Sequence, residues 1–435
     1  MERLLGRVLE DQRRTGGRRA QATDPAPELR RPLHQGPVGG CCLAPTPSGP
    51  GSSSGSGLGE LLAELQSYGV RVEDGIQARR GGAGPSDAGM IRVEGVPVTF
   101  PFTADYVAES PYVLRRERAE GQEDGGGWGV YREGRRLAGA EVPPRPKFYE
   151  LTTADGIPYW KIALLHLDSL ASTVIQTCLY WGKDDQCRFC GIELSLEAGR
   201  TIPVKKPEHL AEVSVAAKEL DGAVDVTLTS GTTGGADKGA RYLGKCARAI
   251  KAASGLPVQA QFEPPADLSV LEEIKEQGVD SVGMHLESFD PGVLAYVAPA
   301  KARTGVAGYF RAWERAVEIF GRGQVSTYVI LGMGEDLQMT IDGCKRAIDA
   351  GVYPFVVPLR PVPGSLMGGK LPPPAEYVES VYREVAPYLA VNGLASWEVH
   401  AGCARCGACS ALAAFEQHGE QPPGGGRQLP ILNVR

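Results

Sequence analysis

The chain has 435 residues, of which 42% are hydrophobic and 23% are charged, and its formal net charge is −6. A chain of this length buries a large core without disulfides, and its acidic balance gives no general attraction to nucleic acid or to an anionic membrane surface. The sequence has no run of about 18 apolar residues and no apolar stretch typical of a secretory signal at its start, so we expect a cytoplasmic protein outside the membrane.

The first third of the chain divides into a tail and a small unit. Residues 1–57 are rich in Arg, Pro, Gly and Ser, which predicts a disordered tail. Its arginines are compatible with an RNA or acidic partner, but a solvated tail is the simpler interpretation, and nucleic acid is not an expected partner. Residues 58–150 contain an amphipathic stretch and the alternating segments 90–102 and 128–139. They predict a small α+β unit, mostly β, of unknown role.

Residues 151–395 alternate regularly between strand and helix patterns. Repeated β–α units with apolar strands predict an α/β fold, a partial (β/α)6 TIM-barrel-like core, with its active site at the C-terminal strand ends. The expected strands are 170–177, 224–230, 257–263, 280–288, 324–334 and 353–362, and the expected helices are 209–220, 239–253, 268–278, 306–323, 338–351 and 376–390. Residues 396–435 form a C-terminal Cys-rich element and a second tail.

Six of the ten cysteines fall into two tight clusters. Cys178, Cys187 and Cys190 occupy one loop directly after the first strand of the series. Three thiolates leave one iron of a [4Fe-4S] cluster open to another ligand, whereas electron-carrying clusters usually take four. A zinc site, with His209 or another cysteine as fourth ligand, is the alternative.

The second cluster, Cys403, Cys406 and Cys409, has ferredoxin-like spacing. It is a candidate ligand set for an auxiliary iron–sulfur cluster whose fourth ligand is another residue or the substrate, with His400 nearby in sequence. A structural zinc site is equally compatible with such spacing. Cys246 and Cys344 lie in predicted helices, where small buried residues are the common reading. Cys41 and Cys42 stay unassigned.

The first cluster, with Phe189 just before its last cysteine, resembles the radical S-adenosylmethionine (radical SAM) signature. It departs from the usual Cys-x3-Cys-x2-Cys spacing, since eight residues separate Cys178 from Cys187. Later segments resemble the family's SAM-binding motifs in order. These are Thr229, Ser230, Gly231 and Thr232 for the amino group, His285 and Glu287 for the ribose, Arg303 for the carboxylate, and Leu331 and Gly332 for the adenine.

This resemblance, over residues 170–370, implies a [4Fe-4S] cluster, SAM, and reductive cleavage to a 5′-deoxyadenosyl radical that abstracts hydrogen from a small-molecule substrate. Flavodoxin or ferredoxin is the implied reductant. The chain looks most like biotin-synthase-like radical SAM proteins encoded in bacterial nitrilase gene clusters, which suggests nitrile or nitrogen metabolism. No further catalytic residue is identified. The alternatives are a zinc-stabilised scaffold and an iron–sulfur redox sensor without SAM chemistry.

Overall fold

The computed structural model describes residues 57–73, 88–117 and 127–416. The predicted tail, apart from Gly57, and the residues after 416 lie outside the described residues, as do Cys41 and Cys42. Residues from Leu58 onward belong to one compact unit. None of the helices described in that unit is long and apolar enough to cross a membrane.

The amino-terminal part pairs one helix with a six-stranded sheet in the order β1-β4-β5-β6-β2-β3. Two hairpins turn at Glu94-Gly95 and Glu133-Gly134, where both residues have positive φ, as two-residue type I′ turns require. The elements are α2 (Leu58–Tyr68), β1 (Arg71–Val72), β2 (Ala88–Val93), β3 (Val96–Pro101), β4 (Tyr112–Arg116), β5 (Trp128–Arg132) and β6 (Arg135–Glu141).

A seven-stranded sheet in the order β13-β12-β11-β10-β9-β8-β7 forms the larger part. Its six parallel strands confirm the predicted fold class. They are β8 (Ser169–Ile175), β9 (Asp225–Ser230), β10 (Val258–Gln261), β11 (Ser281–Gly283), β12 (Val325–Leu331) and β13 (Val352–Pro358). The edge strand β7 (Leu164–His166) was not predicted. It pairs antiparallel with β8 through a tight turn at Leu167, whose φ is 58°.

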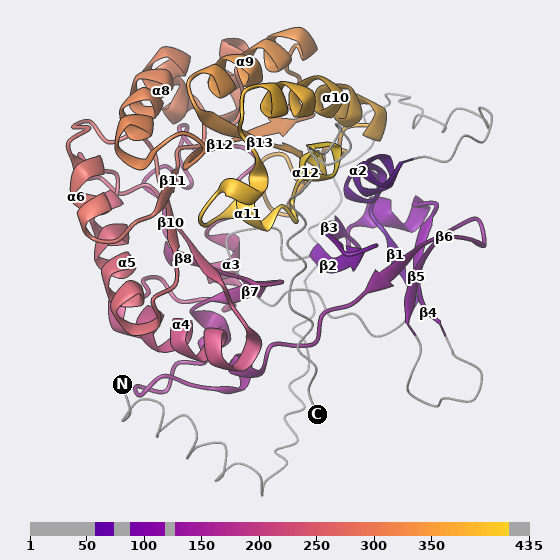
Figure 1. Ribbon diagram of the computed structural model, residues 1–435, viewed down its shortest axis with the longest axis horizontal. Helices are drawn as coiled ribbons and strands as arrows, with labels where there is room; N and C mark the ends of the chain where they lie inside the picture. Colours follow the sequence, from indigo (N-terminus) through magenta and orange to yellow (C-terminus); the bar gives the residue numbers. More distant parts are fainter. Residues whose placement is uncertain (1–56, 74–87, 118–126, 417–435) are drawn as a thin grey trace, which may run out of the picture. The chain divides into compact units, whose positions relative to one another are not determined.

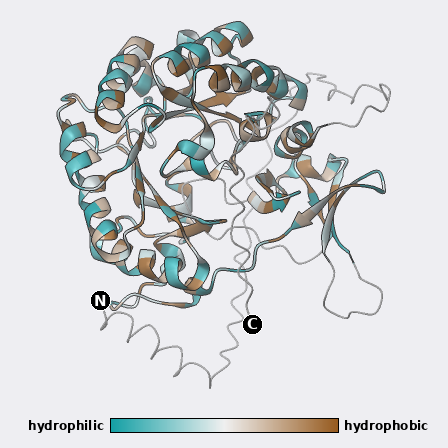
Figure 2. Cartoon of the chain, in the orientation of Figure 1, coloured by the Kyte–Doolittle hydropathy of each residue, from teal (hydrophilic) through white to brown (hydrophobic). Residues whose placement is uncertain are grey.

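Helices cover the outer face of this curved sheet, and the buried apolar core is formed by their inward faces together with the strands (Figures 1 and 2). The long helices are α4 (Pro207–Asp221), α5 (Ala240–Ser254), α6 (Val270–Glu276), α7 (Pro291–Val297), α8 (Pro299–Phe320), α9 (Leu337–Asp349) and α10 (Ala375–Val391). Short ones are α3 (Leu194–Glu197), α11 (Cys403–Cys406), α12 (Leu412–Glu416) and the 3-10 turns η1 (Asp105–Glu109), η2 (Lys147–Glu150), η3 (Tyr159–Lys161) and η4 (Ser396–Glu398).

One predicted helix begins earlier than its sequence pattern indicated. The helix expected over 306–323 starts at Pro299, and Gly305 interrupts it with a non-helical conformation. A separate helix, α7, precedes it and is capped by the Asp290 carboxylate, which accepts from the amides of Gly292 and Val293. Proline is well suited to the first turn of a helix, so Pro291 and Pro299 begin these helices rather than mark a loop.

Candidate metal and cofactor site

The first cysteine triad, Cys178, Cys187 and Cys190, lies on the loop after β8, at the C-terminal end of the parallel strands. All three thiols are free and partly exposed. The turn after β9 packs on this loop, since the amide of Leu179 donates to the carbonyl oxygen of Thr232 over 2.8 Å. The triad therefore sits at the end of the barrel where catalytic residues of such folds gather.

Gly231 lets the turn after β9 approach the first cysteine. A β-carbon at this position would lie 2.0 Å from the carbonyl oxygen of Thr177 and 3.1 Å from Cα of Cys178. The predicted SAM-binding turn therefore also shapes the cysteine loop. Thr229 ends β9 together with Ser230, whose Oγ is buried and has no hydrogen-bond partner among the residues described.

The protein around Cys187 and Cys190 favours neutral thiols. Burial raises the pKa of Cys187 well above its ordinary value and that of Cys190 to about 11, while the ammonium of Lys301 acts in the opposite direction on both. The backbone amide of Ile192 also favours the Cys190 thiolate. Because metal ligation requires the thiolate, a metal must displace these protons on binding.

Glu287 and Lys301 form a buried ion pair beside the triad. The Lys301 ammonium lies 2.6 Å from Oε1 of Glu287 and 2.7 Å from the carbonyl oxygen of His285. Burial is the largest single influence and would lower the pKa of Lys301, but Glu287, with smaller contributions from Tyr309, Cys187 and Glu263, raises that pKa well above its ordinary value. Glu287 has a φ of 76°, unusual for a residue other than glycine, and β12 holds it there by backbone hydrogen bonds at Tyr328 and Ile330.

His285 presents a buried donor in the barrel interior. Its Nδ1 accepts from the backbone amide of Tyr328 over 3.2 Å, so Nε2 carries the proton of the neutral ring. Nε2 is buried, and no residue in the described part of the chain bonds to it. Burial and the charge of Lys301 lower the pKa of His285 to about 3, so the ring is neutral at physiological pH.

Glu263 joins the site without having been predicted. It follows β10 and accepts from the hydroxyl groups of Tyr180, over 3.3 Å, and Thr232, over 2.7 Å. It thereby ties the cysteine loop to the turn after β9. The signal that could have found it is a carboxylate at the C-terminal end of a barrel strand. Lys301 was not predicted either, because only Arg303, two residues later, matched a SAM-binding motif.

Arg303 contacts the cysteine loop itself. Its guanidinium pairs with Asp185, with Nη2 3.0 Å from Oδ2, and this hydrogen bond holds the pKa of Asp185 below its ordinary value. Asp185 belongs to the eight residues between the first two cysteines. The Arg303 side chain is 59% exposed, so its fork remains reachable from solvent.

In the segment after β12, where Leu331 and Gly332 were predicted to lie beside adenine, backbone groups rather than side chains are available for contacts. The Leu331 side chain is fully buried, and Gly332 has a φ of 92°. The amides of Gly332, Met333 and Gly334 donate to the Glu335 carboxylate over 2.7, 2.8 and 3.0 Å. A β-carbon on Gly332 would lie 2.7 Å from Pro373, so this glycine lets the Pro373 ring pack closely on the backbone.

Two further predicted residues have clear structural neighbours. Phe189 is partly buried and packs on the apolar core. Next to it, Arg188 stacks on the ring of Tyr296, 4.2 Å from its centroid. His209, the zinc alternative's ligand, lies on α4 with its Nε2 3.1 Å from Asp155.

The second cysteine triad, Cys403, Cys406 and Cys409, lies on the inner side of the curved sheet, where Figure 1 shows α11. Cys403 Sγ accepts from Nε2 of Gln261 over 3.2 Å and from the hydroxyl of Tyr328. Burial raises the pKa of Cys403 to about 11 despite these donors.

The segment carrying this triad closes the N-terminal end of the barrel. Ser281, the first residue of β11, donates from its hydroxyl to the carbonyl oxygen of Ala401 over 2.9 Å. Asp225, the first residue of β9, accepts from the Gly402 amide over 2.8 Å and from Nε of Arg405 over 2.7 Å. Cys403 itself reaches Gln261, the last residue of β10, so this triad extends from the N-terminal end into the barrel interior. His400 is exposed, and its amide bonds to Gln324.

The amino-terminal unit also contacts the second triad. The backbone amide of Thr99 donates to the carbonyl oxygen of Ala408 over 2.7 Å, and its Oγ1 lies 3.5 Å from Sγ of Cys409. Gln66 brackets the same segment with hydrogen bonds to Ala408 and Ala411. Thr99 and Gln66 thus fix the position of residues 408–411.

Across residues 57–73, 88–117 and 127–416, no three His, Cys, Asp or Glu side chains converge closely enough to hold a single metal ion. A [4Fe-4S] cluster spreads its thiolates over different irons, so its ligands need not meet at one point. Three thiols on one loop, together with the buried polar atoms Ser230 Oγ and His285 Nε2, are a donor set that fits a cluster with a polar cofactor beside it.

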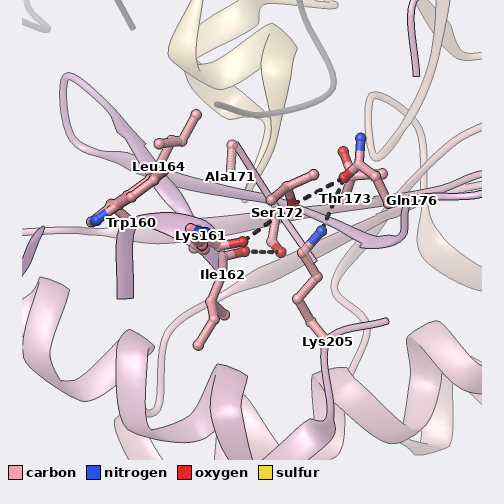
Figure 3. Close-up of a pocket in the computed structure, with 11 residues that line it drawn as sticks. Trp160, Lys161, Ile162, Leu164, Ala171, Ser172, Thr173, Gln176 and Lys205 are labelled. Carbon is pink, nitrogen blue, oxygen red and sulfur yellow. Dashed lines mark hydrogen bonds between the residues drawn. The ribbon is translucent and has the colours of Figure 1, made fainter. Parts of the chain in front are cut away.

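A small pocket of about 10 Å³, room for about one water molecule, lies beside Gln176 and Lys205 behind the cysteine loop (Figure 3). In it the buried Lys205 ammonium donates to Oε1 of Gln176 over 2.9 Å, and Nε2 of Gln176 donates to the carbonyl oxygen of Ile192 over 2.7 Å. Burial lowers the pKa of Lys205 to about 7. These contacts anchor the end of the loop two residues after Cys190.

Comparison with known protein families gives one match. The sequence model of the Radical SAM superfamily matches residues 184–353. The matched range includes Cys187, Cys190 and strands β9 to β12.

Individual relatives are more distant. Over 132 residues the chain is 32% identical to bacteriochlorophyllide c C-7(1)-hydroxylase of Chlorobaculum limnaeum, covering 30% of this chain and about a third (33%) of the hydroxylase. Methylornithine synthase matches at a TM-score of 0.41 and 15% identity, over 57% of this chain and 68% of its own. A radical SAM methyltransferase from Sphaerobacter thermophilus matches at a TM-score of 0.39 and 13% identity, and the match covers 68% of this chain and 76% of the methyltransferase. At these scores neither structure decides an activity.

Proposed function

We propose that this chain, which contains a radical SAM superfamily domain, is an enzyme that holds a [4Fe-4S] cluster on Cys178, Cys187 and Cys190 and cleaves SAM reductively. The observation that carries the proposal is the position of three thiols, with no fourth cysteine on their loop, at the C-terminal end of a parallel partial barrel. Three thiolates leave one iron for the amino and carboxylate groups of SAM.

Bound SAM would supply a 5′-deoxyadenosyl radical that abstracts a hydrogen atom from the substrate. The chain's own residues would bind and orient it. Glu287, fixed by Lys301, can accept from the ribose hydroxyls, and the Nε2 proton of His285 can be donated to an oxygen. Arg303 offers a planar fork to a carboxylate. The turn 229–232 and the Gly332 backbone would line the amino and adenine ends.

The substrate is proposed to be a small molecule that reacts at a C–H bond within the barrel. Flavodoxin or ferredoxin is the proposed electron donor, and a reducing cytoplasm suits eight free cysteines in the described residues. A biotin-synthase-like subtype and a link to nitrile or nitrogen metabolism belong to the same proposal. They rest on the resemblance of residues 170–370 alone.

We also propose that Cys403, Cys406 and Cys409 hold a second iron–sulfur cluster. Its support is the hydrogen bonding of the thiols, since donors to sulfur are typical of iron–sulfur sites. Gln261, Tyr328 and Thr99 provide such donors from strands of two different sheets. A structural zinc ion remains the competing occupant.

The deciding experiment is anaerobic reconstitution with iron and sulfide, followed by addition of dithionite and SAM and assay of 5′-deoxyadenosine. We expect product from the wild type and none from Cys187→Ala. Cys246→Ala is the matched control, because this buried thiol lies on α5, away from both triads. A colourless zinc protein that yields no 5′-deoxyadenosine would overturn the proposal.

A further inference from the structure

The two cysteine sites differ in the hydrogen bonds that their thiols accept. In the second triad, Cys403 accepts from two side chains, Gln261 and Tyr328, and Cys409 lies within reach of the Thr99 hydroxyl. In the first triad, the backbone amide of Ile192 is the donor to Cys190. Among the residues that the structure describes, no side chain donates a hydrogen bond to a first-triad thiol.

Tyr328 is held in place for this contact. Its ring packs edge-on against His285, with centroids 4.6 Å apart, and against Phe355, with centroids 5.0 Å apart. Its hydroxyl hydrogen-bonds to Cys403, and a phenol O–H is a donor to sulfur.

Gln261 is oriented just as firmly. Nε2 of Gln261 donates both to Cys403 and to Oε1 of Gln259, over 2.7 Å, so the amide nitrogen faces the sulfur. Oε1 of Gln259 in turn accepts from the Cys403 amide over 3.4 Å. Gly402 is required here, because a β-carbon on it would lie 2.1 Å from the Gln259 side chain.

The two sites open on the same interior. Gln261 contacts Cys403, whereas Glu263, two residues further along the same chain, contacts the first-triad loop through Tyr180. Two extended residues span roughly 7 Å at most. His285, whose carbonyl oxygen accepts from Lys301, packs against Tyr328 with ring centroids 4.6 Å apart, so the surroundings of the two triads are in contact.

Hydrogen bonds to a cluster's sulfurs stabilise its more negative, reduced state and make its reduction potential less negative. We propose that Tyr328 and Gln261 set the reduction potential of the second cluster through their hydrogen bonds to Cys403, and that this cluster is therefore reduced more easily than the first. The inference rests on the proposed second cluster. Tyr328 and Gln261 are positioning residues in this role, because they act through Cys403.

The test compares Tyr328→Phe and Gln261→Leu with wild type in the reconstituted full-length protein. Iron per chain is measured, and each cluster is titrated with a reductant while its electron paramagnetic resonance signal is followed. We expect about eight irons per chain, four for each cluster, in all three proteins. At a fixed potential near the wild-type midpoint, the ratio of reduced to oxidised second cluster should fall about threefold to tenfold in each variant, a shift of about 30–59 mV to more negative potential.

Tyr159→Phe is the matched control. It removes a buried hydroxyl whose partner, Glu212, lies on α4. It should leave both midpoints unchanged, and the first cluster's midpoint should stay unchanged in every variant.

The outcomes separate the two proposals. About eight irons with an unshifted second midpoint in both variants would overturn the role of Tyr328 and Gln261 and leave the second cluster standing. About four irons in wild type, unaltered by Cys406→Ala, or zinc in place of the second four irons, would overturn the second cluster itself. A second cluster that is reduced at a more negative potential than the first would contradict the proposed order.

Discussion

The ammonium of Lys301 lies 2.6 Å from Oε1 of Glu287 in the interior of the barrel, and both residues are neighbours of the Cys187 thiol. Both side chains are nearly buried, with exposed fractions of 11% and 8%. A buried ion pair adds little net stability, because desolvation offsets the attraction between the charges. Removing one partner is strongly destabilising, because it leaves the other charge buried without compensation.

Lys301→Met should lower the free energy of unfolding by about 3–5 kcal/mol, because it leaves the Glu287 carboxylate buried without its cation. Adding Glu287→Leu should recover part of this loss. Chemical denaturation of the apoprotein measures both changes. Lys345→Met is the control: its pair with Glu384 is on the surface, with Glu384 57% exposed, and should be worth about 0–1 kcal/mol. Equal losses at the two positions would contradict this account.

Gly231→Ala should remove the first cluster and spare the second. The new β-carbon would meet the carbonyl oxygen of Thr177, so the loop carrying Cys178 must shift. We expect iron per chain to fall by about half after reconstitution, with loss of 5′-deoxyadenosine formation. Gly234→Ala, three residues away, meets no atom within 4 Å and should keep both clusters. Full iron content in Gly231→Ala would mean that the loop tolerates the shift.

Variants of Arg303 and Asp185 can show whether the Arg303 guanidinium binds SAM or only stabilises the cysteine loop. If Arg303 binds the SAM carboxylate, Arg303→Gln should raise the dissociation constant of SAM about tenfold or more, since hydrogen bonds to charged groups contribute about 1.5–3 kcal/mol. Asp185→Asn should change it less than about threefold. Calorimetry on the reconstituted protein measures both. Arg241→Gln, which breaks the exposed pair with Glu273, is the control. Equal effects of the first two variants would assign Arg303 to the loop alone.

Stability should rise with pH through Lys205. Its folded-state pKa of about 7 lies below the ordinary value of 10.5, so between these values the unfolded chain binds more protons than the folded one. The free energy of unfolding of wild type relative to Lys205→Met should therefore increase between pH 7 and pH 10, by at most about 1.4 kcal/mol per pH unit. Below pH 7 the difference should be constant. A flat difference across the whole range would show that Lys205 keeps its proton when folded.

The parallel strands were predictable because each is a short apolar run followed by an amphipathic helix. Three strands were not. β1 (Arg71–Val72) has only two residues, and β4 (Tyr112–Arg116) lacks clear alternation. β7 is separated from β8 by only two residues, Leu167 and Asp168, so the two strands look like one continuous segment. The periodicity of a sequence predicts whether a segment is a helix or a strand. It does not predict a turn that contains neither glycine nor proline.

The residues of the site could be predicted where they lie close together in the sequence. They could not be predicted where only the fold brings them together. The spacing of Cys187 and Cys190 is visible in the chain, and the SAM-contact roles of residues such as Glu287 and Arg303 stay predictions. The contact of Glu263 with Tyr180, 83 positions apart, has no local signature. Neither has the approach of Thr99 to Cys409, 310 positions apart.

The hydrogen bonds of Gln66 and Thr99 to Ala408 also impose an order of assembly. Gln66 and Ala408 are 342 positions apart, so residues up to Ala408 must be synthesised before the second triad can make these contacts. The first triad and its supporting strands emerge far earlier, and domains generally fold as synthesis proceeds from the amino terminus. If both triads bind iron, as proposed, the two sites become available at different times, and a chain ended before Cys403 would carry the cysteines of the first site only.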